Sequence, residues 1–165
     1  MGPNSSPDKD PTMPDVLTLL KKDHDKVKKL FKEVNDVSDG AHATRRKLFE
    51  QIDEELSLHA KLEETIFYPK FKAKSKAASE ERDEILEAYE EHASVKELLR
   101  KIEATDPSDE TYKAKVQVLS ELVEHHVKEE ETEMFKQAKK LFSSEELDEI
   151  GAEIEAAKER VGAKA

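Results

Sequence analysis

The chain has 165 residues, which is about the length of one domain and enough to bury a single continuous core. Charged residues make up 41% and apolar residues 36%, with few glycines, prolines and aromatics, and this mix predicts an all-α fold of long amphipathic helices. The formal net charge of −11 argues against nucleic-acid and anionic-membrane partners, and the absence of cysteine excludes disulfides, thiolate zinc sites and iron–sulfur clusters.

The N-terminal third of the chain predicts an arm and two helices. Residues 1–13 hold three prolines and almost nothing apolar, so we expect a disordered arm there. A first helix is predicted over residues 14–37, because Pro14 suits the first position of a helix and a Ser-Asp-Gly break follows. A second helix is predicted over residues 44–68, where Pro69 ends or kinks it.

The rest of the chain predicts three more helices. After a Lys/Ala/Ser linker at residues 72–79, a third helix is expected over residues 80–103. An Asp-Pro-Ser turn then leads into a fourth helix over residues 109–141. Ser143-x-x-Glu146 has the form of a capping box and opens a shorter fifth helix. Long helices joined by short loops predict an up-down-up-down four-helix bundle, with the fifth helix across or beside it.

These boundaries predict a disordered arm at 1–13, one bundle domain at 14–142 and a C-terminal helix and tail at 143–165. No apolar run approaches the ~20 residues of a membrane span, and the N-terminus lacks the apolar segment of a secretory signal. We therefore expect a cytoplasmic protein with no membrane partner.

Each of the four long helices carries polar residues where its apolar stripe would place a hydrophobic side chain. These residues are His24, His59, Glu63, His92, His126 and Glu130. A lone histidine on such a stripe is more often a hydrogen-bonded core residue than a metal ligand. A buried ionised glutamate is different, because it loses much of its solvation unless a cation or hydrogen-bond donors replace the water. Two His-x-x-x-Glu pairs, each with both side chains on one helix face, therefore favour a metal site.

The polar residues also form an internal repeat. His24 and His92 are 68 positions apart (92 − 24), and His59 and His126 are 67 apart (126 − 59). At about 1.5 Å per residue, His24 and His59 lie roughly 20 and 24 Å from the loop between their helices, so they are level. Two antiparallel hairpins with the same ligand set would form a pseudo-two-fold site, which suggests two metal ions.

The fourth helix offers a rival register, because His125 and Glu129 have the same spacing as the pair that begins at His126. Large apolar residues stand eight and nine positions after His59, and large apolar residues stand at the same offsets after His126. This match favours the register that begins at His126. We therefore place His125 and Glu129 around the site or on the surface, and we expect His42 to be solvated.

With these motifs the sequence resembles the hemerythrin-like proteins, also called the HHE cation-binding family, over about residues 14–140. The matching motifs are Asp23-His24-Asp25, the segment from His59 to Pro69, Glu91-His92, and the segment from His126 to Glu130. The resemblance implies a di-iron centre in which His24 and His59 bind one iron, His92 and His126 bind the other, and Glu63 and Glu130 bridge them. It also implies that Glu64, Glu91 and Tyr89 support these ligands. Imidazole and carboxylate suit zinc and manganese too, so the residues alone do not choose the metal.

One position departs from the family pattern. Oxygen-carrying hemerythrins have a further histidine one turn after the third-helix ligand, and here that position is Lys96. Reversible oxygen transport is therefore not favoured, and open positions on the metals would permit small-molecule chemistry.

Three functions follow from this interpretation. The first is a non-haem di-iron protein that binds or reacts with dioxygen, peroxide or nitric oxide in stress or redox response. Catalase-like turnover is left open, as is any protein partner. The second is an iron-responsive sensing or storage module in which metal occupancy controls bundle stability. The third is a metal-free interaction bundle.

Overall fold

A computed structural model describes residues 14–164, so the arm expected at residues 1–13 lies outside the described residues. Helices account for nearly all of the described part, which contains no strand. The α-helices are α1 (Val16–Asn35), α2 (His42–Leu62), α3 (Tyr68–Lys74), α4 (Glu80–Glu103), α5 (Tyr112–Glu129), α6 (Phe135–Leu141) and α7 (Ser144–Lys164). Two π-helical turns, η1 (Glu63–Phe67) and η2 (Glu130–Met134), join α2 to α3 and α5 to α6.

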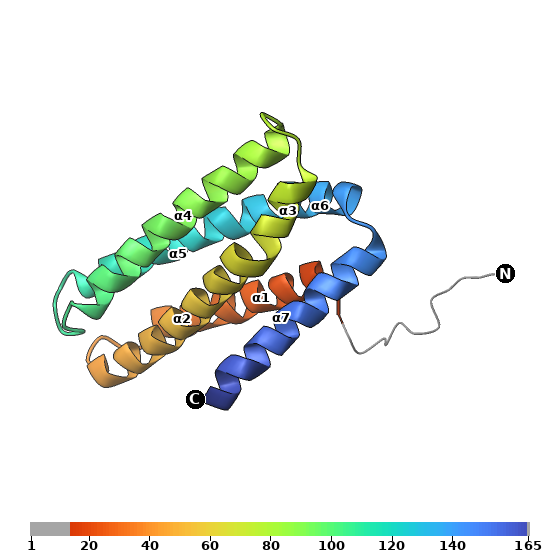
Figure 1. Cartoon of the computed structure of the whole chain (residues 1–165). Helices are drawn as coiled ribbons and strands as arrows, with labels where there is room; N and C mark the ends of the chain where they lie inside the picture. The colour runs from red at the N-terminus through yellow and green to blue at the C-terminus, as the bar shows by residue number, and fades with distance from the viewer. Residues whose placement is uncertain (1–13, 165) are drawn as a thin grey trace.

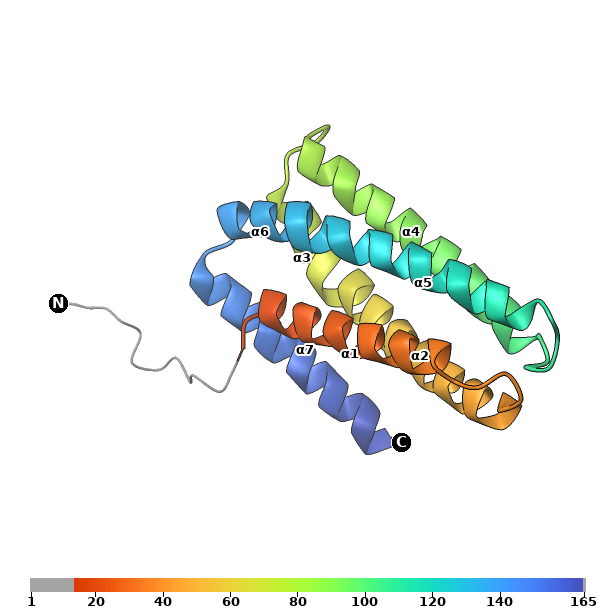
Figure 2. The ribbon, with the colours of Figure 1, turned by 180° about the vertical axis from the view of Figure 1, so that it is seen from behind.

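The helices form four antiparallel rods and one additional helix. The rods are α1, the continuous run α2–η1–α3, α4, and the continuous run α5–η2–α6, and the α1–α2 and α4–α5 loops lie at the same end (Figure 1). Helix α7 turns back along α1, on the side away from α4 and α5, as both views show (Figure 2). The predicted all-α bundle with a fifth helix is confirmed. The fifth helix is not short, however, because its 21 residues match the 20 of α1.

The second rod continues past Pro69, so the helix end expected at residue 68 is wrong. The π-helical turn η1 precedes the proline, and the amide of Tyr68 donates to the carbonyl of Glu63, five residues earlier. Proline has no amide hydrogen to donate to the next carbonyl in this series, that of Glu64. The Tyr89 hydroxyl lies 3.4 Å from the Glu64 carbonyl oxygen and donates to it instead. The rod therefore runs on to Lys74.

Side-chain caps fix the starts of α1, α4 and α7. Asp15 accepts a hydrogen bond from the Thr18 amide at the start of α1. The capping box predicted for the fifth helix is present, since the Ser143 hydroxyl accepts from the Glu146 amide and the Glu146 carboxylate accepts from the Ser143 amide.

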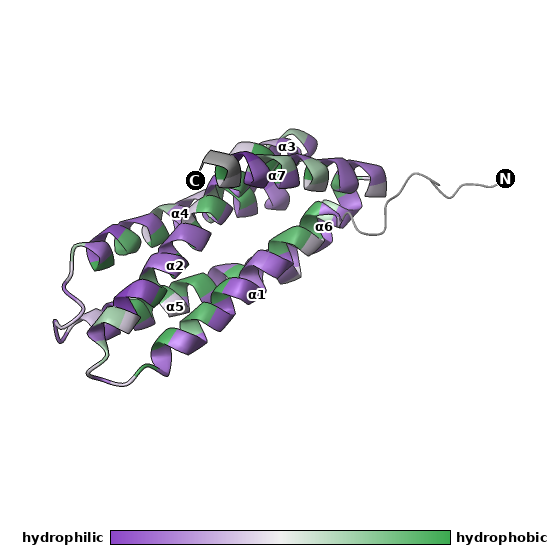
Figure 3. Cartoon of the chain, turned by 90° about the horizontal axis from the view of Figure 1, so that it is seen from below, coloured by the Kyte–Doolittle hydropathy of each residue, from purple (hydrophilic) through white to green (hydrophobic). Residues whose placement is uncertain are grey.

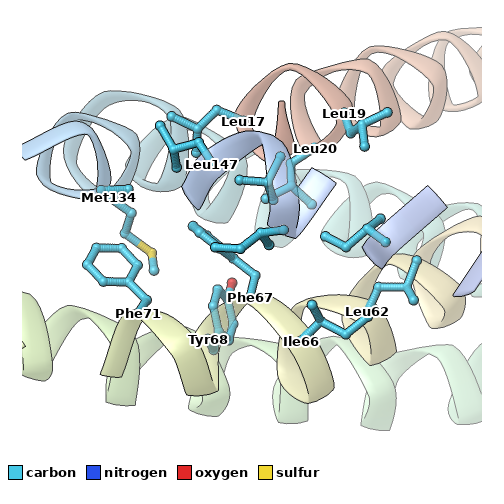
Figure 4. Packing of buried hydrophobic residues seen from close by; sticks show 14 of the residues in the cluster. Leu17, Leu19, Leu20, Leu62, Ile66, Phe67, Tyr68, Phe71, Met134 and Leu147 are labelled. Carbon is cyan, nitrogen blue, oxygen red and sulfur yellow. The ribbon is translucent and has the colours of Figure 1, made fainter. Parts of the chain in front are cut away.

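The apolar core is divided into two clusters. One lies toward the end that carries the α1–α2 and α4–α5 loops, and it contains Phe31, Phe49, Ile52, Leu99, Ile102 and Leu119. The other includes Leu17, Leu20, Phe67, Phe71, Leu147 and Ile154, and it joins α7 to the bundle (Figure 4). Each long helix turns an apolar side inward and a hydrophilic side outward (Figure 3). Along every rod the polar residues predicted for the metal site fall between the two clusters. Among residues 14–164, every helix is too short or too polar to span a lipid bilayer.

Candidate metal centre

The six polar residues predicted from the apolar stripes meet in one buried layer. His24 comes from α1, His59 from α2, His92 from α4 and His126 from α5, while Glu63 and Glu130 begin η1 and η2. Both glutamates are 0% exposed and the four histidines are 5–7% exposed. All four rods therefore contribute to the layer.

The first half of the layer joins α1 and α2. The Nε2 atoms of His24 and His59 face each other at 3.2 Å. Glu130 Oε1 lies 2.9 Å from His24 Nε2, and Glu63 Oε1 lies 3.2 Å from His59 Nε2. These four side chains bring their donor atoms close enough to share one cation.

The second half repeats this arrangement between α4 and α5. The Nε2 atoms of His92 and His126 are also 3.2 Å apart. Glu63 Oε1 lies 3.1 Å from His92 Nε2, and Glu130 Oε2 lies 3.4 Å from His126 Nε2. Each glutamate thus reaches a histidine in both halves, as a bridging ligand must.

A carboxylate faces the outer nitrogen of every histidine in the layer. The Nδ1 atoms of His24, His59, His92 and His126 lie 2.6, 3.0, 2.7 and 2.7 Å from Glu131, Asp23, Glu64 and Glu91, respectively. Such a partner holds the proton on Nδ1 and turns the Nε2 lone pair inward. Glu64 and Glu91 were expected near the site. The contacts of Asp23 and Glu131 with the histidines were not predicted, although the repeat matches Asp23 to Glu91 and Glu131 to Glu64.

The donor set fits a divalent metal ion. Four Nε2 atoms converge on two carboxylates, and neither Glu63 Oε2 nor Glu130 Oε1 accepts a hydrogen bond although both are buried. Glu130 Oε1 is near His24 Nε2, but that contact lacks hydrogen-bond geometry. Carboxylate oxygens left unpaired in an apolar core are costly unless a cation binds them.

Without a metal, protons supply the positive charge. Burial is the largest single effect on the pKa of His59 and would lower it, but Glu63, Asp23 and Glu130 together outweigh burial and raise that pKa to about 10. Burial also opposes the charged forms of His24 and His126, and the surrounding glutamates, Glu130 first among them, together raise both pKa values. At Glu63 the combined effect of its neighbours, chiefly His59, outweighs burial and holds the pKa of that carboxyl well below its ordinary value. The layer therefore requires protons or a metal ion.

Two local features of the layer were not predicted from the sequence. Each of the two buried glutamates is the first residue of a π-helical turn, a distortion that often marks functional sites. The second feature is Tyr68, whose hydroxyl donates to Glu130 Oε2 at 2.5 Å and to Glu63 Oε1 at 3.1 Å. The repeat places Phe135 at the matching position, and its ring stacks on His24. Tyr68 therefore supplies a buried hydrogen-bond donor to the layer, whereas the residue that matches it in the repeat, Phe135, is apolar.

The remaining polar candidates lie outside the layer. The side chains of His125 and Glu129 are 65% and 47% exposed, so the structure supports the register that begins at His126. His42 is exposed at the start of α2. Lys96 lines the cavity that adjoins the four histidines, but its ammonium donates to Glu64 at 3.1 Å.

A small cavity of about 30 Å³ adjoins the layer and touches all four histidines. Its other walls are mainly apolar and include Val27, Leu56, Val95, Leu99, Val123 and Val127. A space of this size holds about two water molecules or one diatomic molecule.

The fold and the site define a helical-bundle, cation-binding protein. The chain belongs to the hemerythrin HHE cation-binding domain family, which it matches over residues 15–138. The resemblance seen in the sequence is thereby confirmed.

Similar proteins are found in cyanobacteria, yeast and mycobacteria. A DNA nickase of Nostoc sp. is 31% identical over 146 residues, which are 88% of this chain but 40% of that protein. An uncharacterized hemerythrin-like protein of Schizosaccharomyces pombe is 30% identical over 141 residues, covering 85% of this chain and 67% of that one. The crystal structure of an HHE cation-binding domain-containing protein from Mycobacterium kansasii superposes with a TM-score of 0.77 at 25% identity, covering 90% and 87% of the two chains.

Proposed function

We propose that this chain is a non-haem di-iron protein that binds or reacts with a small oxidant. In this proposal His24 and His59 hold one iron, His92 and His126 hold the other, and Glu63 and Glu130 bridge them. The pairing is supported by the two groups of convergent donors, which share Glu63. Iron held by imidazole and carboxylate supplies Lewis acidity and redox chemistry.

The small apolar cavity is the observation that carries the oxidant part of the proposal. Its volume of about 30 Å³ admits dioxygen, nitric oxide or hydrogen peroxide but no larger substrate. Its valines and leucines surround the histidines with apolar side chains on this side of the layer, which strengthens the charge interactions there. Tyr68 holds a proton at its hydroxyl oxygen, because burial and the two bridging glutamates raise its pKa well above the ordinary value.

An activity on DNA receives less support. The Nostoc relative is a DNA nickase, but this chain spans only 40% of it. A formal net charge of −11 also disfavours nucleic acid as a partner of this domain.

The reaction with a small oxidant can be tested by comparing a peroxide that fits the cavity with one that does not. Iron-loaded protein is mixed with hydrogen peroxide or with tert-butyl hydroperoxide, and the change in visible absorption is followed by stopped flow. We expect hydrogen peroxide to react at least about tenfold faster, because the bulky peroxide does not fit. Val95→Phe, which fills the cavity, should slow the hydrogen peroxide reaction by a similar factor and leave the iron content unchanged.

Val118→Phe is the matched control, since Val118 is 48% exposed on α5 and does not line the cavity. The proposal is wrong if both peroxides react equally fast or if Val95→Phe and Val118→Phe have the same rate.

A sensing module is the second candidate, and one observation favours it. The metal layer takes ligands from all four rods, so metal occupancy is coupled to the closure of the whole bundle. Chelation should then lower the thermal unfolding midpoint by many degrees. A midpoint that does not move on chelation would contradict this function.

A further inference from the structure

A second pocket leads from the surface to the metal layer between α4 and the run α5–η2. Its volume is about 100 Å³, and its inner end is formed by His126 and Glu130. Five further carboxylates line it, those of Glu84, Glu87, Glu91, Glu129 and Glu133. The pocket is therefore an acidic passage that ends at two of the predicted metal ligands.

The counter-charges of this passage are histidines and not lysine or arginine side chains, since Glu91 contacts both His126 and His125. Among the described residues, no lysine or arginine forms an ion pair with any of the five, whereas Glu55 and Glu146 elsewhere each pair with a lysine. Glu84 Oε2 is buried without a hydrogen bond, and burial together with the charge of Glu133 raises the pKa of Glu84. At the inner end, Glu130 is 0% exposed and its Oε1 atom accepts no hydrogen bond. The passage thus presents one buried unpaired oxygen, that of Glu84, and ends at Glu130, whose unpaired Oε1 lies 2.9 Å from His24 Nε2.

A mixed imidazole and carboxylate group stands at the mouth. His125 Nε2 lies 3.1 Å from Glu129 Oε1 and 3.7 Å from Glu91 Oε2. These three side chains bring one donor atom each within 4.8 Å of one another. The other oxygen of Glu91 accepts from His126 Nδ1 at 2.7 Å. The carboxylate of Glu91 therefore contacts both the exposed His125 and the buried His126.

The other hairpin has no such passage. Subtracting the repeat of 68 from Glu84 and Glu87 gives Val16 and Leu19, and subtracting 67 from Glu129 and Glu133 gives Leu62 and Ile66. These four apolar residues belong to the cluster that α7 covers (Figure 4). This route to the layer is therefore closed within the first hairpin and open within the second. A separate pocket of about 640 Å³ between α1 and α5 also reaches His24.

We propose that this glutamate-lined passage is the route by which a divalent cation enters the metal centre, and that Glu91, His125 and Glu129 form its first binding site. A field of carboxylates raises the local concentration of cations and speeds their association. The inference rests on metal binding by the buried layer and not on any reaction with an oxidant.

The rate of metal loading tests the route. Metal-free protein is mixed anaerobically with ferrous ion, passed at intervals through a chelating column, and assayed for retained iron. We expect Glu87→Gln/Glu133→Gln to load at least about tenfold more slowly at low salt and to reach the same final iron content. The difference should vanish at about 1 M salt, where the Debye length is ~3 Å.

Glu33→Gln/Glu110→Gln is the matched control, because it removes the same charge from exposed positions outside the passage. If this control slows loading as much as the passage variant, overall charge explains the effect and the route is wrong. Equal rates for the passage variant and the unmodified protein would also overturn it.

The outer binding site is tested on iron-loaded protein, so the result does not depend on the metal-free fold. Manganous ion is titrated into that protein and followed by electron paramagnetic resonance. We expect a single additional bound ion in the unmodified protein and none in His125→Ala/Glu129→Gln, with the buried iron retained. Manganese binding that persists in this variant, or buried iron that is lost with it, would overturn the assignment.

Discussion

The two helical hairpins, residues 16–74 and 80–141, supply the same ligands but surround them differently. In the first hairpin, α7 packs on the apolar residues around the layer, and Lys158 of α7 binds Asp23 at 2.7 Å. In the second hairpin, the corresponding face is open and acidic. The two hairpins are thus alike in the buried layer, where each supplies two histidines and a glutamate. They differ around the layer, where α7 covers only the first hairpin.

The strongest test of this comparison is the pair of bridging glutamates. Each reaches a histidine in both halves, so Glu63→Gln and Glu130→Gln should weaken metal binding to the same extent. Because a ligand is lost, we expect a decrease in affinity of more than about 100-fold, measured by competition with a chelator of known affinity. Glu54→Gln on the exposed face of α2 serves as the control. Retention of one tightly bound metal in only one of the two ligand variants would show that the halves are independent.

The next prediction concerns pH and applies to both halves. Binding of a metal must displace protons from histidines whose pKa is raised, which include His24, His59 and His126. Apparent affinity should therefore rise by about tenfold per pH unit for each proton released. Measurement of metal affinity between pH 6.5 and 10 checks this. If only one of the two bound ions responded to pH, the two halves would not be equivalent.

Metal affinity should rise with pH, but the stability of the metal-free protein should fall as the pH rises from 6 to 9. His59 has a folded pKa of about 10 against an ordinary value of 6.5, so its stabilising effect is complete below 6.5 and is lost as the pH rises toward 10. Glu63 has a folded pKa well below 4.5, so its effect is present above 4.5 and is lost on further acidification. Metal-free protein should unfold at a lower temperature at pH 9 than at pH 6. Thermal unfolding with and without metal gives the comparison.

Tyr68 and Phe135 differ between the halves, and the hydroxyl can be tested alone. Tyr68→Phe removes a buried donor to two carboxylates, so the metal-free protein should lose about 1.5–3 kcal/mol of unfolding free energy in denaturant. Tyr112→Phe is the control, because the Tyr112 hydroxyl is buried without a hydrogen-bond partner and its removal should cost nothing. Equal losses for the two variants would mean that the contact of Tyr68 with the glutamates contributes no stability.

The sequence predicted which polar side chains meet in the buried layer, because placing a charge on an apolar stripe is costly and therefore informative. The apolar stripes identified His24 and Glu63, and the repeat chose His126 over His125. The π-helical turns were not foreseen, since the segment after Glu63 has ordinary helical periodicity and the extra residue per turn leaves no local signal. The role of α7 was missed as well, because its cover over Val16 and Leu62 depends on tertiary packing.

Gly151 of α7 packs against the backbone at the start of α1, and it gives the smallest predicted effect. A Cβ atom there would lie 2.6 Å from the Pro14 carbonyl oxygen, which belongs to the backbone. Alanine favours a helix over glycine by about 1 kcal/mol, but the overpacking costs about 1–3 kcal/mol. Gly151→Ala should therefore lower stability by about 1 kcal/mol, whereas Gly162→Ala, which meets nothing within 4 Å, should not. Because α7 covers the first hairpin, amide exchange should rise in α1 and not in α4. Faster exchange in α4 would mean that α7 supports the whole bundle and that the two hairpins are not separately enclosed.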